Sequence, residues 1–230
     1  MAQIVLIPGL MNDAWVWRHQ LGVLSRLGPV HIACNDGCDR LDGMAARILD
    51  ATSGPLAVIG HSMGGRVALE LALAAPERVT RLALVASGAH GVGAAEADGR
   101  RHLVDLARRD GMGAVADAWM PAMVGAAGRA NAGLMQGLKA MLSRCAVDIF
   151  AAQQHALLHR QDRMGSLATL PCPTLFVAGD EDPTSSPAFN REMAALARHG
   201  QYVELDNAGH MLPIEQPSAL AAQLRAFIAG

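Results

Sequence analysis

The chain has 230 residues, of which 51% are hydrophobic and 17% are charged. That composition excludes a disordered protein, and the length favours one large domain over two small ones. With 19 basic and 21 acidic residues the net charge is −2, and no dense basic face is present, so nucleic acid is not an expected partner.

The first apolar run, at residues 4–8, predicts a buried strand. It is too short for a signal peptide and has neither a basic lead-in nor a small-residue cleavage site. Further along, no run of 18 apolar residues is free of charge or proline, so we expect no membrane partner. These features favour a cytoplasmic protein.

Short apolar runs rich in Val and Ile alternate with helical patterns along most of the chain. The runs predicted as strands are residues 4–8, 30–34, 56–60, 82–86, 174–178 and 202–205. The predicted helices are residues 14–27, 41–51, 63–75, 187–198 and 217–229. Such alternation predicts an α/β fold built on a mostly parallel, doubly wound sheet of about six strands.

Residues 88–165 interrupt this alternation. They contain no convincing strand, only Ala, Met, Leu and Arg at helical spacing, with breaks near Gly111, Gly125 and Gly133. We interpret the segment as short helices inserted into a sheet domain formed by residues 1–87 and 166–230. Because no low-complexity linker flanks the insertion, we expect it to pack on the sheet domain.

Four cysteines are spread through the chain. Cys34, Cys38, Cys145 and Cys172 form no Cys-x-x-Cys pair and have no histidine nearby at zinc-finger spacing. This pattern argues against a structural zinc ion and against a disulfide framework. We expect four free thiols in or near the core.

The strongest chemical signal is the sequence Gly60-His61-Ser62-Met63-Gly64-Gly65, which directly follows a predicted strand and opens a predicted helix. A serine in such a turn needs small neighbours, because side chains at the flanking glycines would collide with the strand and the helix. The start of the helix offers unpaired N–H groups suited to an oxyanion. The motif therefore predicts Ser62 as a nucleophile, the alternative being a glycine-rich packing turn.

A serine nucleophile needs a base, and the base needs an acid to orient it. Two loops after predicted strands supply both: Gly179-Asp180-Glu181-Asp182-Pro183 and Asp206-Asn207-Ala208-Gly209-His210. The chain order Ser62, Asp182, His210 is the order expected for a strand-turn-helix nucleophile of this kind. Asp180 follows its strand too closely to turn towards His210, so Asp180 and Glu181 are expected on a solvated face of the loop.

These motifs resemble the α/β-hydrolase superfamily over nearly the whole chain. The matching pieces, in order, are Ile7-Pro8-Gly9-Leu10, the glycine-flanked serine, Ala75-Pro76-Glu77-Arg78-Val79, Pro171 through Pro183, and Asn207-Ala208-Gly209-His210 followed by Glu215-Gln216-Pro217. The resemblance implies an α/β-hydrolase fold, with Ser62 as nucleophile, His210 as general base and Asp182 as its acid.

The resemblance also implies an oxyanion hole and a cap. Backbone N–H groups of Met63 and Leu10 would hold the oxyanion, although this chain has Pro8-Gly9 where many relatives carry His-Gly. The insertion at 88–165 resembles the helical cap that covers the pocket in this superfamily.

Several large side chains are candidates for contact with substrate. From the cap, Trp119 and Met123 are predicted to line the pocket, and from the sheet-side loops Met11, Trp15 and Met211. The alternative is that the methionines, which also include Met112, Met120, Met135 and Met141, fill the core. His61 is expected to pack beside the serine, and His90 is a further candidate for contact with the pocket. A solvated helix face is expected for Arg100, Arg101, Arg108 and Arg109, with one of them available to form a salt bridge across the cap or to contact an anionic substrate.

The pattern as a whole predicts a serine hydrolase acting on a small, mainly apolar carboxylic ester without a cofactor. The serine at position 62 excludes dehalogenase and epoxide hydrolase chemistry, which needs a carboxylate there, and Pro183 argues against hydroxynitrile lyases. Thioesters, lactones and C–C bonds remain open as substrates. So do a ligand-binding protein with slow or single turnover, a purely structural role, and both a monomer and a homodimer.

Overall fold

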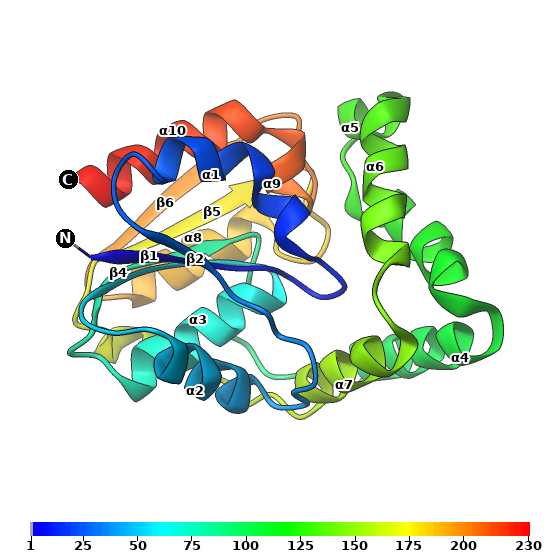
Figure 1. Cartoon of the computed structure of the whole chain (residues 1–230), viewed down its shortest axis with the longest axis horizontal. Helices are drawn as coiled ribbons and strands as arrows, with labels where there is room; N and C mark the ends of the chain where they lie inside the picture. Colours follow the sequence, from blue (N-terminus) through cyan, green and yellow to red (C-terminus); the bar gives the residue numbers. More distant parts are fainter. Residues whose placement is uncertain (1) are drawn as a thin grey trace.

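The computed structural model describes residues 2–230 and contains a single six-stranded sheet (Figure 1). Its strands run in the order β2-β1-β3-β4-β5-β6, and every neighbouring pair is parallel. The strands are β1 (Gln3–Ile7), β2 (Val30–Ile32), β3 (Leu56–His61), β4 (Val79–Val85), β5 (Thr174–Gly179) and β6 (Gly200–Leu205). The predicted parallel α/β sheet is therefore confirmed, and it has the α/β-hydrolase fold.

Helices cover both faces of this sheet. Figure 1 shows α1 and α10 side by side on one face, and α2 and α3 on the other. The helices of the sheet domain are α1 (Arg18–Leu24), α2 (Leu41–Ala51), α3 (Met63–Ala74), α8 (Pro187–Leu196), α9 (Leu212–Glu215) and α10 (Pro217–Ala229). Because the central strands are covered on both faces, their sequences are continuously apolar, and every residue of β3 and β5 is buried.

Most differences from the predicted elements lie at their ends. The helix predicted over 14–27 is divided into a 3-10 turn, η1 (Ala14–Trp17), and α1, because the Asp13 carboxylate accepts the N–H of Trp15 and starts the turn. Strand β4 begins earlier than predicted, at Val79, where the exposed Thr80 hides the apolar pattern. The short helix α9 was not predicted.

Between β4 and β5 the described chain forms only helices and loops. The helices are α4 (Ala94–Met123), α5 (Ala126–Ala130), α6 (Ala132–Ser143), α7 (Val147–Leu158) and the 3-10 helix η2 (Met164–Thr169). Gly111, with φ of 82°, breaks α4 where a break was predicted. Helix α4 packs against α6 and α7, and the buried apolar side chains of the segment belong to the same hydrophobic core as those of the sheet. The segment extends beyond one end of the sheet (Figure 1). No helix within residues 2–230 combines the length and the apolar character that crossing a membrane requires.

The four cysteines are free thiols, as predicted, but not all lie near the core. Cys172 is buried, whereas Cys34 is exposed. Cys34 follows the edge strand β2, where the chain already leaves the sheet, so the expectation of a core position was wrong for this residue.

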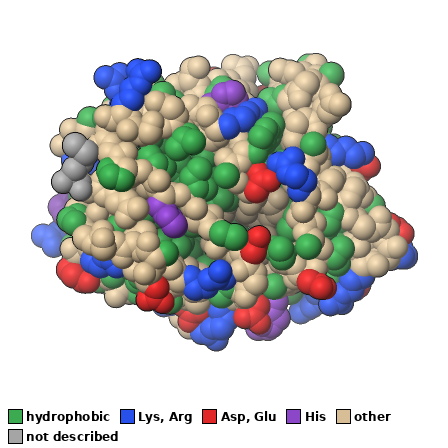
Figure 2. Space-filling view, in the orientation of Figure 1, with side chains coloured by type: hydrophobic (Ala, Val, Ile, Leu, Met, Phe, Trp, Pro, Cys, Tyr) green, Lys and Arg blue, Asp and Glu red, His purple; other side chains and the backbone are tan. Residues whose placement is uncertain are grey.

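Charged side chains of both signs are interspersed on the face of the molecule shown in Figure 2. On this face, positive and negative side chains are therefore not separated into two large patches of opposite charge. This distribution offers no basic surface there for nucleic acid to follow.

A leucine pair tests how strongly the sheet depends on its apolar interior. Leu84 in β4 is 0% exposed and Leu196 at the end of α8 is 44% exposed. We expect Leu84→Ala to lower the free energy of unfolding by about 2–5 kcal/mol in urea denaturation, because it removes buried methyl groups and leaves a cavity. The same change at Leu196 should cost less than about 0.5 kcal/mol. Equal effects would contradict the assignment of the core.

Candidate active site

The turn that carries Ser62 joins β3 to α3 with almost no space around it. Ser62 has φ of 53° and ψ of −118°, a left-handed conformation that non-glycine residues rarely adopt. A Cβ on Gly60 would lie 2.2 Å from the Gly64 carbonyl oxygen, and one on Gly64 would lie 2.1 Å from the Ile7 carbonyl oxygen. Both glycines are therefore required if α3 is to start directly above the end of β3.

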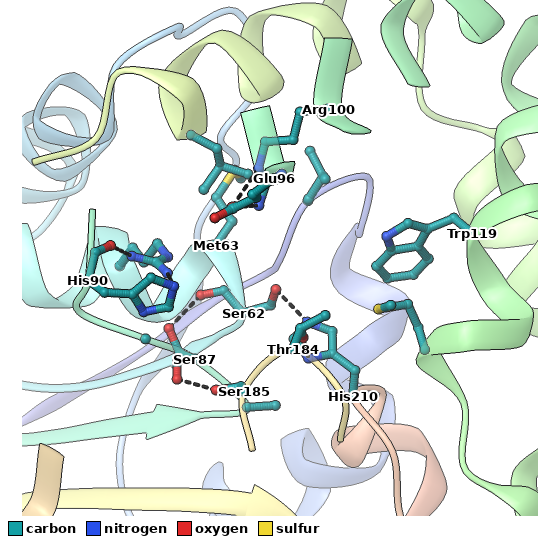
Figure 3. Close-up of a pocket in the computed structure, with 16 residues that line it drawn as sticks. Ser62, Met63, Ser87, His90, Glu96, Arg100, Trp119, Thr184, Ser185 and His210 are labelled. Atoms are coloured by element: carbon teal, nitrogen blue, oxygen red, sulfur yellow. Dashed lines mark hydrogen bonds and ion pairs between the residues drawn. The ribbon is translucent and has the colours of Figure 1, made fainter. Parts of the chain in front are cut away.

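Three side chains from the ends of three parallel strands meet at this turn. Ser62 Oγ lies 2.7 Å from His210 Nε2, to which its hydroxyl donates (Figure 3). His210 Nδ1 lies 2.9 Å from Asp182 Oδ2. Ser62 follows β3, Asp182 follows β5 and His210 follows β6. The structure thus brings together the predicted nucleophile, base and acid in one hydrogen-bonded chain.

The carboxylate of Asp182 is fixed by four donors. The Thr184 hydroxyl and the backbone N–H groups of Thr184 and Ser185 donate to Oδ1, while His210 donates to Oδ2. Burial of Asp182 raises its pKa, but the charge and hydrogen bond of His210 and these two amides outweigh burial and hold the pKa below its ordinary value. The acid is therefore ionised at neutral pH and keeps the Nδ1 proton of His210 in place.

His61 packs beneath this chain, beside the serine as expected. Its Nε2 donates to the backbone oxygen of His210 at 2.8 Å, and its Nδ1 accepts from the Asn12 side-chain amide at 3.2 Å. Burial, and then the neighbouring charge of His210, lower the pKa of His61 to about 3, so this ring is neutral. A neutral His61 can hold the backbone of His210 without placing a charge of its own beside the site.

The two residues predicted to offer backbone N–H groups to an oxyanion line the same cavity. Leu10 and Met63 both line it, and among residues 2–230 neither amide has a hydrogen-bond acceptor. Met63 is the first residue of α3, so its N–H is one of the helix's unpaired donors. The loop that carries Leu10 is held at its next residue, because the N–H of Met11 donates to the side chain of Gln153 in α7 at 2.9 Å.

The cavity above Ser62 has a volume of about 270 Å³ and two chemically different sides. One side is apolar and includes Trp119 and Met123. The other is polar and charged and includes Arg66, His90, Glu96 and Arg100. In Figure 3, Trp119 faces the cavity from the side of His210, and Glu96 and Arg100 lie across from it. The size fits a small substrate.

Of the five predicted pocket residues, Trp119 and Met123 line the cavity, and Met11, Trp15 and Met211 do not. Met11 and Met211 are 2% and 0% exposed and pack in the core beneath the site. The Arg18 guanidinium carbon lies 3.5 Å from the centre of the Trp15 ring, and this ring also approaches Gly137 of α6. These three side chains therefore support the loops around the site.

The charged side of the cavity was largely missed from the sequence. Arg100, expected on a solvated helix face, instead donates to Glu96 and to the Gln154 side chain of α7. Arg66 follows Ser62 by four residues, so it lies one helical turn after the serine on the same side of α3. This four-residue spacing could have identified Arg66 as a candidate pocket residue from the sequence alone. His90, a candidate from the sequence, also lines the cavity.

Glu215 connects the loop of His210 to the helical segment, and its role was not predicted. Its carboxylate accepts the N–H groups of Gly125 at 2.7 Å, Gly209 at 3.1 Å and Met211 at 2.9 Å. Burial raises the pKa of Glu215, against the lowering effect of these amides. In parallel, the N–H of His210 donates to the Met123 carbonyl at 2.7 Å. The end of α4 and the His210 loop are thus one hydrogen-bonded unit.

The acidic loop after β5 also meets this segment. Glu181 is exposed, yet its carboxylate accepts the N–H of Ala126 at the start of α5, at 2.7 Å. Asp180 accepts the N–H of Ala208, so both neighbours of the acid support loops and neither contacts His210. Within residues 2–230, no group of three or more His, Cys, Asp or Glu side chains is arranged to hold a metal ion.

Comparison with protein families matches residues 4–223 to the Alpha/beta hydrolase family. A polyketide synthase, ThaQ of Burkholderia thailandensis, is 28% identical over 98% of this chain but only 12% of its own length. The pimeloyl-[acyl-carrier protein] methyl ester esterase of Nitrosomonas europaea is 52% identical over 92 residues, 36% of each chain. The chain therefore spans 12% of the length of the first of these curated relatives and 36% of the length of the second.

Solved structures match over the whole chain. A thermophilic esterase from Thermogutta terrifontis superposes with a TM-score of 0.90 at 25% identity, covering 100% of this chain and 90% of that one. The enol-lactonase from Burkholderia xenovorans gives a TM-score of 0.91 at 23% identity, covering 100% and 92%. Because its sequence identity is below 25%, the similarity to the enol-lactonase concerns the fold alone.

The depressed pKa of Asp182 predicts a pH dependence of stability. A carboxyl whose pKa is lower in the folded than in the unfolded chain stabilises the fold above the unfolded value, about 3.9, and loses this contribution as pH falls below it. We expect the difference in free energy of unfolding between the parent and Asp182→Asn to shrink between pH 6 and pH 3 in urea titrations. The exposed Asp50→Asn should follow the parent. A difference that stays constant over this range would contradict the prediction.

Glu215→Gln tests the link between α4 and the His210 loop. Three N–H groups converge on the two carboxylate oxygens, and glutamine would offer one oxygen and turn an NH₂ group towards a donor. We expect a loss of about 1–3 kcal/mol in free energy of unfolding and faster hydrogen exchange at Gly125 and Gly209. The matched control is Glu192→Gln, on the exposed side of α8, with a change under about 0.5 kcal/mol. Unchanged exchange at both glycines would contradict the prediction.

Proposed function

Because this chain belongs to the alpha/beta hydrolase family, we propose that it is a serine hydrolase that cleaves a small carboxylic ester through an acyl-enzyme. The observation that carries the proposal is the unbroken hydrogen-bonded chain from Ser62 through His210 to Asp182. It opens into a cavity that is also bordered by the amides of Leu10 and Met63. The pimeloyl-[acyl-carrier protein] methyl ester esterase relatives and the Thermogutta esterase support an ester as substrate.

In the first half of the reaction, Ser62 Oγ attacks the ester carbonyl carbon while His210 Nε2 takes the hydroxyl proton. The tetrahedral intermediate then collapses, the C–O bond to the alcohol breaks, and His210 returns the proton to the leaving alkoxide. In the second half, His210 removes a proton from water, the hydroxide attacks the acyl-enzyme, and the acid leaves as Ser62 recovers its proton. No cofactor takes part.

The backbone N–H groups of Leu10 and Met63 act on the oxygen that becomes negative in both halves. Donors already fixed in position need no reorganisation when charge develops, and removing one such donor in other hydrolases costs about 3–4 kcal/mol. Asp182 stays ionised throughout and stabilises the transient imidazolium of His210.

Residues 88–165 act as a cap in this proposal, over a core formed by residues 1–87 and 166–230. Trp119 and Met123, near the end of α4, provide its apolar wall above the serine. Because Glu215 ties the end of α4 to the His210 loop, this part of the cap is fixed relative to the base. Substrate size is then limited by the cavity and not by a freely swinging lid.

Replacing the nucleophile tests the function directly. We expect Ser62→Ala to lower kcat for p-nitrophenyl butyrate by about 10⁴-fold or more, because no other group can form the acyl-enzyme. It should also abolish labelling by a fluorophosphonate, detected by mass. The exposed Ser25→Ala is the matched control and should match the parent in both assays.

Two outcomes would contradict the proposal. Undiminished ester hydrolysis by Ser62→Ala would exclude Ser62 as nucleophile. Stoichiometric labelling of the parent at Ser62, with no sustained turnover on any ester, thioester or lactone offered, would instead indicate a ligand-binding protein with an intact triad.

A further inference from the structure

The charged side of the cavity holds more positive than negative charge. Arg66 and Arg100 line it together with a single carboxylate, Glu96, and the guanidinium of Arg160 lies directly behind. Glu96 is ionised, because despite burial the charges and hydrogen bonds of Arg160 and Arg100 lower its pKa to about 2. The exposed Asp162 contributes one further negative charge from outside the cavity.

The three arginines differ in how their donors are used. Arg160 donates through Nε to the His90 carbonyl, through Nη1 to Glu96 and the Leu157 carbonyl, and through Nη2 to Glu96 and the Gly91 carbonyl. A guanidinium has five N–H groups, so none is left over. Arg160 is a structural clamp for the loop after β4.

Arg66 is the opposite case. Its only recorded partners are parts of His90: Nη1 donates to the carbonyl at 2.7 Å, and Nη2 lies 3.4 Å from the ring nitrogen Nε2. No carboxylate is hydrogen-bonded to Arg66 in residues 2–230, and three of its five N–H groups have no acceptor there. Burial, and then the charge of Arg160, lower the pKa of Arg66 to about 9, so it is a cation at neutral pH.

The neighbouring imidazole does not compensate this cation. Burial, and then the charges of Arg66 and Arg160, lower the pKa of His90 to about 4, so its ring is neutral at pH 7. The ring packs edge-on against Phe189, with the centroids 4.7 Å apart, which fixes its position. Gly88 leaves the space that Arg66 occupies, because a Cβ there would lie 2.9 Å from Arg66 Nη2.

We propose that Arg66, supported by Arg100, forms a subsite for a carboxylate group of the substrate. The hydrolase would then act on esters that carry a second, free carboxylate, with the ester carbonyl at Ser62 and the free carboxylate at Arg66. The two residues are separated by one turn of α3, a rise of about 6 Å, which suits a short spacer. A planar guanidinium is the side chain best matched to a carboxylate.

This inference rests on the proposed ester hydrolysis and sharpens it. The sequence predicted a mainly apolar substrate, because all five candidate pocket residues, Trp119 and Met123 among them, were apolar. In the folded protein those two residues form only one wall. The opposite wall offers a half-buried cation, Arg66, one helical turn away from Ser62.

Matched substrates test the subsite by kinetics. Monoethyl glutarate carries a carboxylate, and ethyl 5-oxohexanoate replaces it by a neutral methyl ketone of similar shape. We expect the parent to favour the glutarate ester by roughly 10- to 100-fold in kcat/KM, the range for a hydrogen bond to a charged group. 4-Acetoxybutanoate and its methyl ester form a second pair with the carboxylate on the alcohol side, and preference in either pair supports the subsite.

The variants separate the subsite from the catalytic groups. Arg66→Gln should lower the ratio of kcat/KM for the glutarate ester to that for the neutral ester to about one, and Arg66→Lys should retain part of the preference because the charge remains. Gly88→Ala, which displaces Arg66 without removing its charge, should also weaken the preference. The matched control is Arg101→Gln, exposed on α4 and paired only with Asp98, which should behave like the parent.

Direct binding keeps failure of the subsite distinct from failure of the proposed function. Glutarate should bind to Ser62→Ala in calorimetry, and the additional change Arg66→Gln should weaken it by at least about tenfold. Equal kcat/KM for charged and neutral esters in the parent would overturn the subsite and leave ester hydrolysis standing. Glutarate binding that is absent, or unaffected by Arg66→Gln, would overturn the subsite even if no ester is turned over.

Discussion

The left-handed turn at Ser62 is the constraint on which the rest of the site depends. A non-glycine residue at φ of 53° is strained by about 1–3 kcal/mol, and it persists because the surrounding chain leaves no other path. Gly60 and Gly64 let α3 start against the ends of β1 and β3, so the serine is pushed above the sheet. The same turn makes Met63 the first residue of α3, so its N–H is unpaired, and both Ser62 and Met63 line the cavity. One backbone distortion thus positions both the proposed nucleophile and one of the proposed oxyanion donors.

The other half of the site is held by electrostatics acting on backbone groups. The loop of His210 has no regular structure of its own until α9, and three contacts fix it: His61 on its carbonyl, the Met123 carbonyl on its N–H, and Glu215 on the amides around it. A buried carboxylate is stable only when such donors converge on it. Because two of these contacts come from or lead to the end of α4, the orientation of His210 and the position of the apolar wall are set together.

Much of the fold and of the site could be predicted from the sequence. The features that could be predicted depend on local sequence patterns, and those that could not depend on how distant segments pack together. The parallel sheet, the serine turn and the proximity of Ser62, Asp182 and His210 follow from local patterns at strand ends, since the carboxyl ends of parallel strands share one edge. The lining of the cavity depends instead on how α4 to α7 pack over that edge. Trp15 was therefore expected in the pocket although it supports α6, and Arg100 was expected in solvent although α7 covers it with Gln154.

The charge of the cavity is a second property that could not be predicted from the sequence. A net charge of −2 over 230 residues carries no information about where single charges are desolvated. Arg66, Arg100 and Arg160 are drawn together because Glu96 and the carbonyls of the loop after β4 satisfy most of their donors. These acceptors leave Arg66 without a carboxylate partner, and a half-buried cation without such a partner lowers the stability of the fold unless a ligand pairs with it. In the proposed subsite, a carboxylate of the substrate supplies the partner that Arg66 lacks within residues 2–230. The polar wall of the cavity, and not the apolar one, then determines which esters are preferred.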